Sequence, residues 1–230
     1  MFGGSSTRWH LFTLGGHRVY LEPVFLILIA IFVFMGLNEA SQLANQLMWA
    51  PVLFIGVLFH EFGHAVVTKR LGFGPSTIIL QGLGGVAINE SKLPRTPGKS
   101  VLISLAGPGA SLLLALISYV ALIALRSAGG GPAVLMYFLQ LNAMINVFWA
   151  GFNMLPINPM DGGQVVLHSL RKFFTVRQAL YYSAVSSLVV LALLGAVGLM
   201  MGYQSFILII IVIMFGMQNY QVIKQLKATS

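Results

Sequence analysis

Residues 49–67 read WAPVLFIGVLFHEFGHAVV, an apolar run with the length of a membrane helix that contains two histidines and a glutamate. Ionisable residues at bilayer depth cost roughly 2.5–3.5 kcal/mol each on insertion scales, so they are retained for a function. His60 and His64 are four residues apart and share one face of a helix, where both imidazoles can bind one metal ion. Glu61 is then held beside the metal without binding it, where it can act as a base. The stretch therefore predicts a membrane-embedded metal site, and zinc is the usual metal for such a site.

The composition agrees with a membrane location. The chain has 230 residues, of which 57% are hydrophobic and 8% charged, whereas a soluble domain averages about 25% charged residues. It contains no cysteine, which excludes disulfides, thiolate ligands and a cysteine nucleophile. The net charge of +8 is best explained by basic cytoplasmic loops that face anionic lipid, and we expect no nucleic-acid partner. Because no long polar stretch is left over, residues 1–230 are predicted to form a single membrane domain.

Six segments are long and apolar enough to be predicted as membrane helices. The fold class expected is an all-α polytopic membrane protein with about six transmembrane helices. Three spans would form a catalytic core over about 47–168, and the other three would be accessory. The six spans are about 20–36, 47–68, 100–125, 133–155, 180–201 and 205–222.

Basic residues orient these spans. Of the 13 Lys and Arg residues, 12 fall at one side of the predicted membrane, and Arg126 is the exception. By the positive-inside rule that side is the cytoplasm, so both termini are predicted to be cytoplasmic. His60 and His64 then lie in the cytoplasmic half of the second span, because Lys69 follows closely.

A glycine-punctuated segment with β-branched residues, Thr77 to Ile88, follows the second span and predicts a small membrane-associated β-hairpin. Backbone groups at membrane depth need partners unless they line a cavity. An extended substrate could supply them by adding to the free edge of the hairpin as a further strand. The alternative is a surface hairpin with no part in catalysis.

Two histidines leave a catalytic zinc site one protein ligand short. Among the five acids, Asp161 lies at the cytoplasmic end of the fourth span, which is the predicted membrane face of His60 and His64. It belongs to NMLPINPMDGG at 153–163, where two prolines break the helix and two glycines allow unusual backbone angles. His168 follows in a predicted short surface helix and fits an ordinary interfacial histidine better than a ligand.

With these motifs the chain resembles the site-2 protease family of intramembrane zinc metalloproteases. The resemblance rests on HEFGH at 60–64, the 153–163 motif, the hairpin and AGPGA at 106–110, and it covers about 47–168. It implies that His60, His64 and Asp161 are zinc ligands and that Glu61 is the general base. It also implies that Asn153 contacts the substrate or polarises its scissile carbonyl. Many members carry a PDZ or CBS module, and none is recognisable here, so a minimal form is expected.

The function predicted is a zinc endopeptidase that cleaves single-span membrane proteins near the cytoplasmic face, in the plasma membrane of a prokaryote. A membrane transporter or metal-ion permease is one alternative, but its polar residues would be spread along several spans. A catalytically inactive scaffold that binds membrane segments is another, although every catalytic residue type is present. The partners expected are the lipid bilayer and the substrates, and the sequence leaves the oligomeric state open.

Overall fold

The structure, a computed structural model, describes residues 7–35, 43–82, 84–200 and 206–228. By its internal contacts the chain divides into two compact units, which are described one at a time. The first unit comprises Met1–Leu93 and Ala106–Ala150, and the second comprises Pro94–Leu105 and Gly151–Ser230. The residues at the ends of three predicted spans lie outside the described residues; they are Gly36, Met201 and Ser205.

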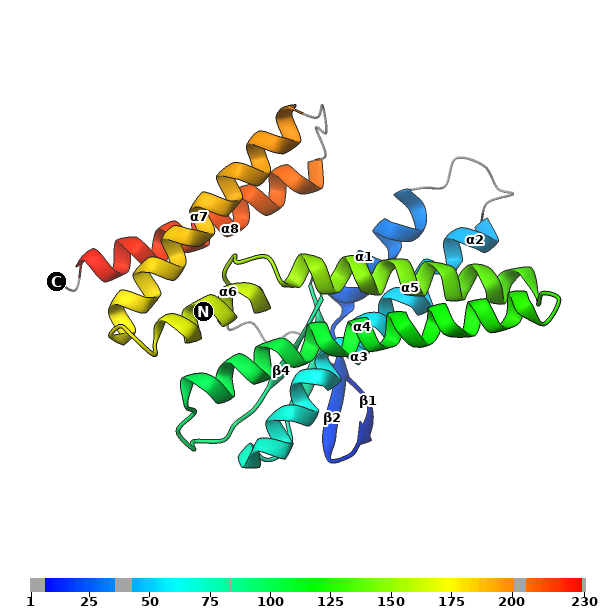
Figure 1. Cartoon of the computed structure of the whole chain (residues 1–230), viewed down its shortest axis with the longest axis horizontal. Helices are drawn as coiled ribbons and strands as arrows, with labels where there is room; N and C mark the ends of the chain where they lie inside the picture. Colours follow the sequence, from blue (N-terminus) through cyan, green and yellow to red (C-terminus); the bar gives the residue numbers. More distant parts are fainter. Residues whose placement is uncertain (1–6, 36–42, 83, 201–205, 229–230) are drawn as a thin grey trace. The chain divides into compact units, whose positions relative to one another are not determined.

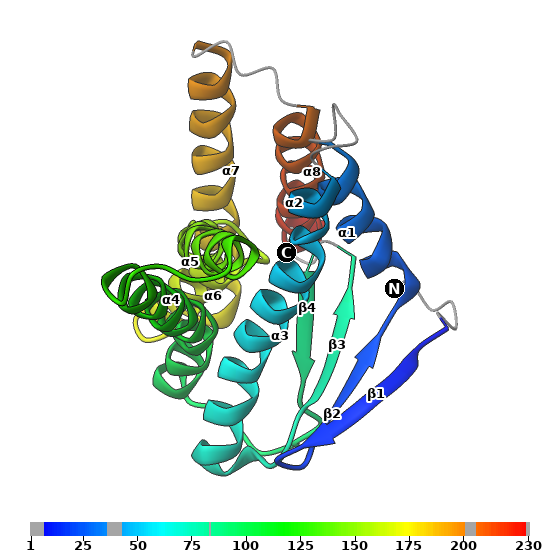
Figure 2. The ribbon, with the colours of Figure 1, turned by 90° about the vertical axis from the view of Figure 1, so that its right-hand side faces the viewer.

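A four-stranded sheet of order β1-β2-β3-β4 forms the first unit together with helices (Figure 2). The strands are β1 (Trp9–Leu14), β2 (His17–Leu21), β3 (Thr77–Gln81) and β4 (Gly84–Ile88). β1 pairs with β2 and β3 with β4 in antiparallel fashion, whereas β2 and β3 run parallel. The hairpin at 77–88 is therefore half of a larger sheet, and the sequence prediction omitted β1 and β2. They turn at Gly15 and Gly16, whose φ angles of 58° and 86° favour glycine.

The first predicted span, 20–36, was placed too early, because Tyr20 and Leu21 belong to β2. The amide of Glu22 still donates to the carbonyl of Leu80, at 2.9 Å, and helix α1 begins only at Pro23. α1 (Pro23–Met35) has 13 residues. At 1.5 Å per residue it is about 20 Å long, which is shorter than the hydrocarbon core of roughly 30 Å.

Helix α3 (Trp49–Thr68) carries the HEFGH motif and follows the short α2 (Leu43–Leu47). It continues as one π-helical turn, η2 (Lys69–Phe73), and stops where Gly72 and Gly74 take positive φ angles of 89° and 79°. Its apolar side packs on the sheet and on α1 in one buried cluster that includes Val19, Phe25, Val57, Ile78 and Leu80. This packing fixes α3 against one face of the sheet (Figure 2).

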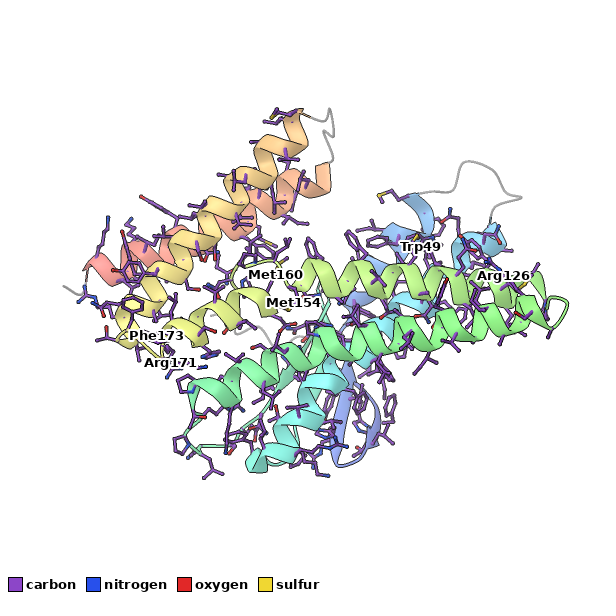
Figure 3. All side chains as sticks on the ribbon, in the orientation of Figure 1. Trp49, Arg126, Met154, Met160, Arg171 and Phe173 are labelled. Carbon is purple, nitrogen blue, oxygen red and sulfur yellow. The ribbon has the colours of Figure 1, made fainter. Side chains whose placement is uncertain are left out.

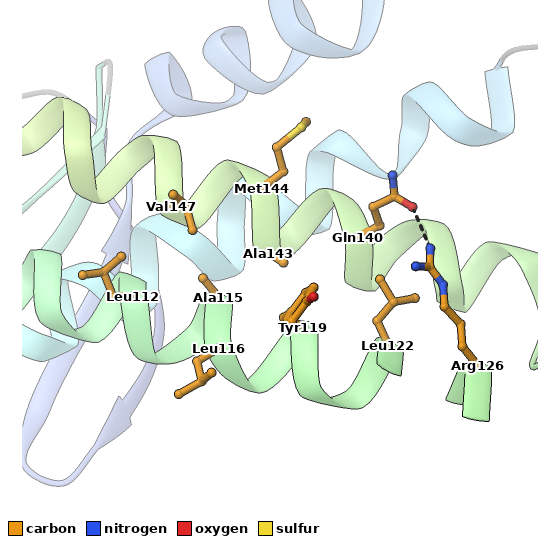
Figure 4. A pocket seen from close by; sticks show the side chains of 10 residues that line it. All are labelled: Leu112, Ala115, Leu116, Tyr119, Leu122, Arg126, Gln140, Ala143, Met144 and Val147. Carbon is orange, nitrogen blue, oxygen red and sulfur yellow. Dashed lines mark hydrogen bonds between the residues drawn. The ribbon is translucent and has the colours of Figure 1, made fainter. Parts of the chain in front are cut away.

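Two long helices, α4 (Pro97–Ser127) and α5 (Ala133–Asn153), continue along the chain from one unit into the other. In the first unit they line an apolar groove of about 650 Å³. The guanidinium of Arg126 donates to Oε1 of Gln140 at one end of it, at 3.4 Å (Figure 4). Along the groove the walls are side chains such as Leu116, Met144 and Val147, as expected of helices that meet lipid.

The second unit contains α6 (Asp161–Leu170), α7 (Val176–Met200) and α8 (Phe206–Ala228), and α7 and α8 pack side by side (Figure 1). Met154 and Met160 flank the turn that leads into α6, while Arg171 and Phe173 lie in the turn that leaves it (Figure 3). A small core of Ile157, Met160 and Leu191 joins the first of these turns to α7.

Within the described residues, five stretches of helix are long and apolar enough to cross a membrane: Leu43–Phe73, Pro97–Ser127, Ala133–Asn153, Val176–Met200 and Leu208–Ala228. The prediction of a mostly helical, integral membrane protein is thereby confirmed. The count of six spans stays a prediction, because α1 is too short by itself and residues 36–42 lie outside the described ones.

Candidate metal centre

The imidazoles of His60 and His64 converge on one point. Their Nε2 atoms are 3.3 Å apart, and the rings meet at 78°. A tetrahedral zinc ion with Zn–N bonds of roughly 2.0–2.1 Å holds two ligand nitrogens about 3.3–3.4 Å apart. The helical spacing of four residues therefore gives the separation that two ligands of one zinc ion need.

Ser111 on α4 orients the first of these rings. Its Oγ lies 3.0 Å from Nδ1 of His60, and Ser111 is fully buried. We assign the proton to Nδ1, which donates to the hydroxyl, so that Nε2 keeps its lone pair for a metal. A hydrogen bond on the second nitrogen is the usual means of fixing a ligand histidine.

Glycines allow α4 to approach the two histidines. A Cβ built on Gly107 would lie 2.7 Å from Nε2 of His60 and even closer to Nε2 of His64. Across the same contact, a Cβ on Gly63 would meet the Cβ of Ala110 at 2.7 Å. The space in front of both Nε2 atoms is thus the space that Gly107 leaves by having no side chain, and the donor groups present fit a zinc ion there.

Glu61 is buried between α3 and the edge of the sheet. It is 6% exposed, and a Cβ built on Gly85 of β4 would lie 2.6 Å from its Cγ and 3.0 Å from its Oε1. Because Gly85 has no side chain, the strand backbone passes directly over the carboxylate. The base predicted from the sequence therefore lies next to the strand predicted to bind substrate.

In the second unit, Asp161 is the first residue of α6. A carboxylate at this position interacts favourably with the positive end of the helix. The two following glycines explain how the turn closes: a Cβ on Gly162 would overlap the carbonyls of Met154 and Leu155, and one on Gly163 would lie 2.5 Å from the amide nitrogen of Asn158. The Asp-Gly-Gly sequence thus lets α6 begin directly against the preceding turn.

Asn158 ties that turn to three helices. Its Nδ2 donates to Oγ of Ser183 on α7, at 2.6 Å, and its Oδ1 accepts from Gln164 of α6, at 3.1 Å. Its own amide donates to Ser187, at 2.9 Å, and its carbonyl accepts from Asn219 of α8, at 2.8 Å. The accessory helices α7 and α8 therefore hold the turn that precedes Asp161.

Asn153 and His168 also belong to the second unit. Asn153 is the last residue of α5, at the start of the turn. Nδ1 of His168 lies 3.4 Å from the guanidinium of Arg171. Burial, then the positive charges of Arg171 and Arg95, lower the pKa of His168 from its ordinary value. These contacts agree with an ordinary interfacial residue.

Three of the residues described above, Gly107, Ser111 and Asn158, were not identified from the sequence. Gly107 and Ser111 were not predicted as site residues, although their spacing of four residues places both on one face of α4. Asn158 gave no signal, because its partners on α7 and α8 lie 25 to 61 residues further along the chain. Asn142 and Asn146 are buried as well, and Nδ2 of Asn146 donates to the carbonyl of Asn142 at 3.0 Å.

Comparisons with known proteins agree with this geometry. The family model of peptidase family M50 matches residues 48–130, which include α3, β3, β4 and all of α4. A zinc metalloprotease of Methanocaldococcus jannaschii is 31% identical over 166 residues, which are 70% of this chain and 45% of that protein. The chain's matches thus span less than half the length of the curated relatives at the head of the comparison.

A solved structure shares the fold. The site-2 protease from Methanocaldococcus jannaschii superimposes with a TM-score of 0.65 at 23% identity, over 94% of this chain and 95% of that one. The sequence signature of residues 48–130, the relatives named zinc metalloproteases and the common fold together confirm that this chain resembles the site-2 protease family of M50 peptidases.

Proposed function

We propose that this protein is a membrane zinc endopeptidase that hydrolyses peptide bonds in transmembrane segments of other membrane proteins. The observation that carries the proposal is the pair of Nε2 atoms, 3.3 Å apart, of His60 and His64, with the space left by Gly107 in front of them and Glu61 on the same helix. A structural histidine pair would not need this space.

His60, His64 and Asp161 form a donor set that could hold a metal ion, two imidazoles and one carboxylate. We assign Asp161 as the third ligand, because it begins a helix in a turn held by Asn158 and because the family motif has its aspartate there. When bound, zinc would activate a water molecule and polarise the scissile carbonyl. His168 is not needed, since its ring is paired with Arg171.

Glu61 is assigned the proton transfers. Its carboxylate takes a proton from the attacking water and returns one to the leaving amine. Burial beside Gly85 keeps bulk water away and holds the carboxylate at the strand. Asn153 is assigned to the substrate, where its amide would contact the backbone or polarise the scissile carbonyl.

The substrate is proposed to add to the sheet next to β4. Among the described strands, only β3 pairs with β4, so the outer side of β4 can accept a further strand. Only two residues separate Gln81 from Gly84, so this pair closes the hairpin with hydrogen bonds. Alternation along the ladder then directs the backbone groups of Gly85 and Ala87 outward. An unwound substrate would meet Glu61 at this edge.

The membrane setting proposed follows the charge asymmetry of the loops. With 12 of 13 basic residues at one side, both termini and the active site would face the cytoplasm, in the plasma membrane of a prokaryote. Single-span membrane proteins are the substrates that such a site could reach, because one isolated helix can unwind more easily than a helix within a bundle.

One set of variants tests both the zinc site and the proteolytic activity. The purified wild type should hold about one zinc per chain, and the His60→Ala/His64→Ala double variant should hold none. Glu61→Gln should keep the zinc and fail to cleave co-expressed single-span proteins, because it removes the base and no ligand. Stoichiometric zinc in the double variant, or wild-type cleavage by Glu61→Gln, would refute the assignment.

The strand-addition step has its own test. Ala87→Pro removes an outward amide without touching the bonds to β3, so cleavage should fall by about tenfold while zinc content stays normal. Ala87→Val keeps the amide and serves as the matched control. Equal cleavage by the proline variant and the wild type would mean that helices alone hold the substrate.

A further inference from the structure

A second pocket lies on the opposite side of α3 from the histidines. It has a volume of about 470 Å³ and belongs wholly to the first unit. Three polar side chains line it, from His17, Lys69 and Arg70. Its apolar wall comes from Leu14, Phe62 and Val66. At 100° per residue, Phe62 and Val66 project away from His60 and His64, so this pocket is separate from the metal centre.

His17 presents a hydrogen-bond donor to this pocket. Its Nδ1 accepts the amide N–H of Ser76, at 2.9 Å, so in the neutral ring the proton is on Nε2. The opposite edge of the ring faces the turn, since a Cβ built on Gly15 would lie 3.7 Å from its Cδ2. The ring is 2% exposed and stands edge-on to Phe62. It is therefore a buried, fixed donor at the pocket.

Two positive charges complete the lining. Nζ of Lys69 donates to the carbonyl of Gly15, at 2.8 Å, which holds the ammonium against the β1–β2 turn. Among the described residues the ion pair found joins Arg8 to Glu22, and no carboxylate pairs with Lys69 or Arg70. Two cations and the N–H donor of His17, with no carboxylate paired to Lys69 or Arg70 among the described residues, are complementary to an anion such as a phosphate.

The position of the pocket points to a lipid phosphate. Lys69 and Arg70 lie near the end of the apolar stretch Leu43–Phe73, which is long enough to cross a membrane. In the proposed membrane setting, that end would lie at the level of the lipid headgroups. Leu14 is 60% exposed and Val66 36%, so apolar surface continues from the cationic lining. We propose that this pocket binds one anionic phospholipid, with its phosphate on His17, Lys69 and Arg70 and an acyl chain along Leu14 and Val66.

A lipid bound there would connect the β1–β2 turn with the end of α3. Both elements already meet through the bond from Lys69 to Gly15, and a phosphate bridging His17 and Arg70 would add further links. The lipid should therefore stabilise the helix that carries the candidate metal ligands. The inference rests on the proposed membrane setting and is independent of the protease assignment.

The test is a binding titration on the purified full chain in neutral detergent. Short-chain phosphatidylglycerol, short-chain phosphatidylcholine and inorganic phosphate are added separately, and thermal unfolding and native mass spectrometry are recorded. We expect phosphatidylglycerol to raise the Tm and to bind with one molecule per chain. Phosphatidylcholine, which carries no net charge, and inorganic phosphate, which has no acyl chain, should do so far less. Equal effects of inorganic phosphate would overturn the lipid assignment.

Variants separate a local site from general attraction. Lys69→Gln/Arg70→Gln should weaken phosphatidylglycerol binding by about thirtyfold, the scale expected for two basic residues at an anionic surface. Lys92→Gln/Arg18→Gln removes the same charge from exposed positions of the same unit and should leave binding unchanged. Equal losses in both double variants would overturn the proposal. Glu61→Gln should bind lipid like the wild type, which keeps this result distinct from that of the protease test.

Discussion

Helix α3 and the turn before α6 both position groups assigned to the metal, and they do so by different means. In α3 a regular helix sets the spacing, and the two Nε2 atoms reach 3.3 Å because four residues make one turn. In the turn the backbone is irregular, and Asn158 holds it through bonds to Ser183, Ser187 and Asn219. Local periodicity is thus sufficient in the first region, whereas the second depends on distant helices.

The largest effect is expected where α4 meets α3. Gly107→Ala places a methyl group in front of both Nε2 atoms, so zinc binding should be lost although neither histidine changes. Gly109→Ala is the matched control, because a Cβ there meets nothing within 4 Å. Elemental analysis of both variants measures their zinc content. Full zinc occupancy in Gly107→Ala would mean that the metal does not lie in this space.

The turn before α6 should lose stability when the hydrogen bonds of Asn158 to the neighbouring helices are removed. Asn158→Ala removes the buried side-chain hydrogen bonds to Ser183 and Gln164, which should cost about 2–3 kcal/mol of unfolding free energy. Zinc content should fall as well if Asp161 is a ligand. Ser186→Ala is the control, because the hydroxyl of Ser186 donates to the nearby carbonyl of Ser183 and does not bond to Asn158. Unchanged stability in detergent unfolding experiments would show that the turn is held without Asn158.

Loss of the hydrogen bond between Ser111 and His60 should have a smaller effect, which is limited to the affinity for zinc. Ser111→Ala removes the hydrogen bond between its hydroxyl and Nδ1 of His60, so the affinity for zinc should fall by about 10- to 100-fold while saturating zinc restores cleavage. Ser118→Ala, also buried on α4, should leave zinc affinity unchanged. Competition with a chelator measures the zinc affinity of both variants. Equal affinities for Ser111→Ala and wild type would contradict the assigned hydrogen bond.

The smallest effect concerns His168. Burial and Arg171 lower its pKa, so the folded protein disfavours the charged ring and loses stability as the pH falls below about 6.5 toward the lowered value. His168→Gln should reduce this loss on the acid side and leave stability at pH 8 and zinc content unchanged. Thermal unfolding at several pH values is the measurement, and a loss of zinc would instead make His168 a ligand.

The sequence was sufficient to predict the features that depend on local residue spacing. His60, Glu61 and His64 follow from helical periodicity, the long helices from apolar length, and β3 and β4 from glycine and β-branched residues. β1 and β2 were missed although Gly15-Gly16 is a hairpin signal, because the first predicted span took in Tyr20 and Leu21 and no element was predicted before it. The parallel pairing of Arg18 with Thr77 joins residues that are 59 positions apart, and no local sequence pattern predicts such a pairing. Ser111 and Asn158 were missed for the same reason.

That parallel pairing constrains how the protein can be made. Because β2 precedes α1 and β3 follows α3, the ladder from Arg18–Thr77 to Leu21–Leu80 cannot close until all the intervening helices have been synthesised. The N-terminal hairpin must therefore remain unpaired with β3 until the helix with the HEFGH motif has been made. Gly85 of β4 lies against Glu61, so the base is covered only after the chain has been synthesised through β4.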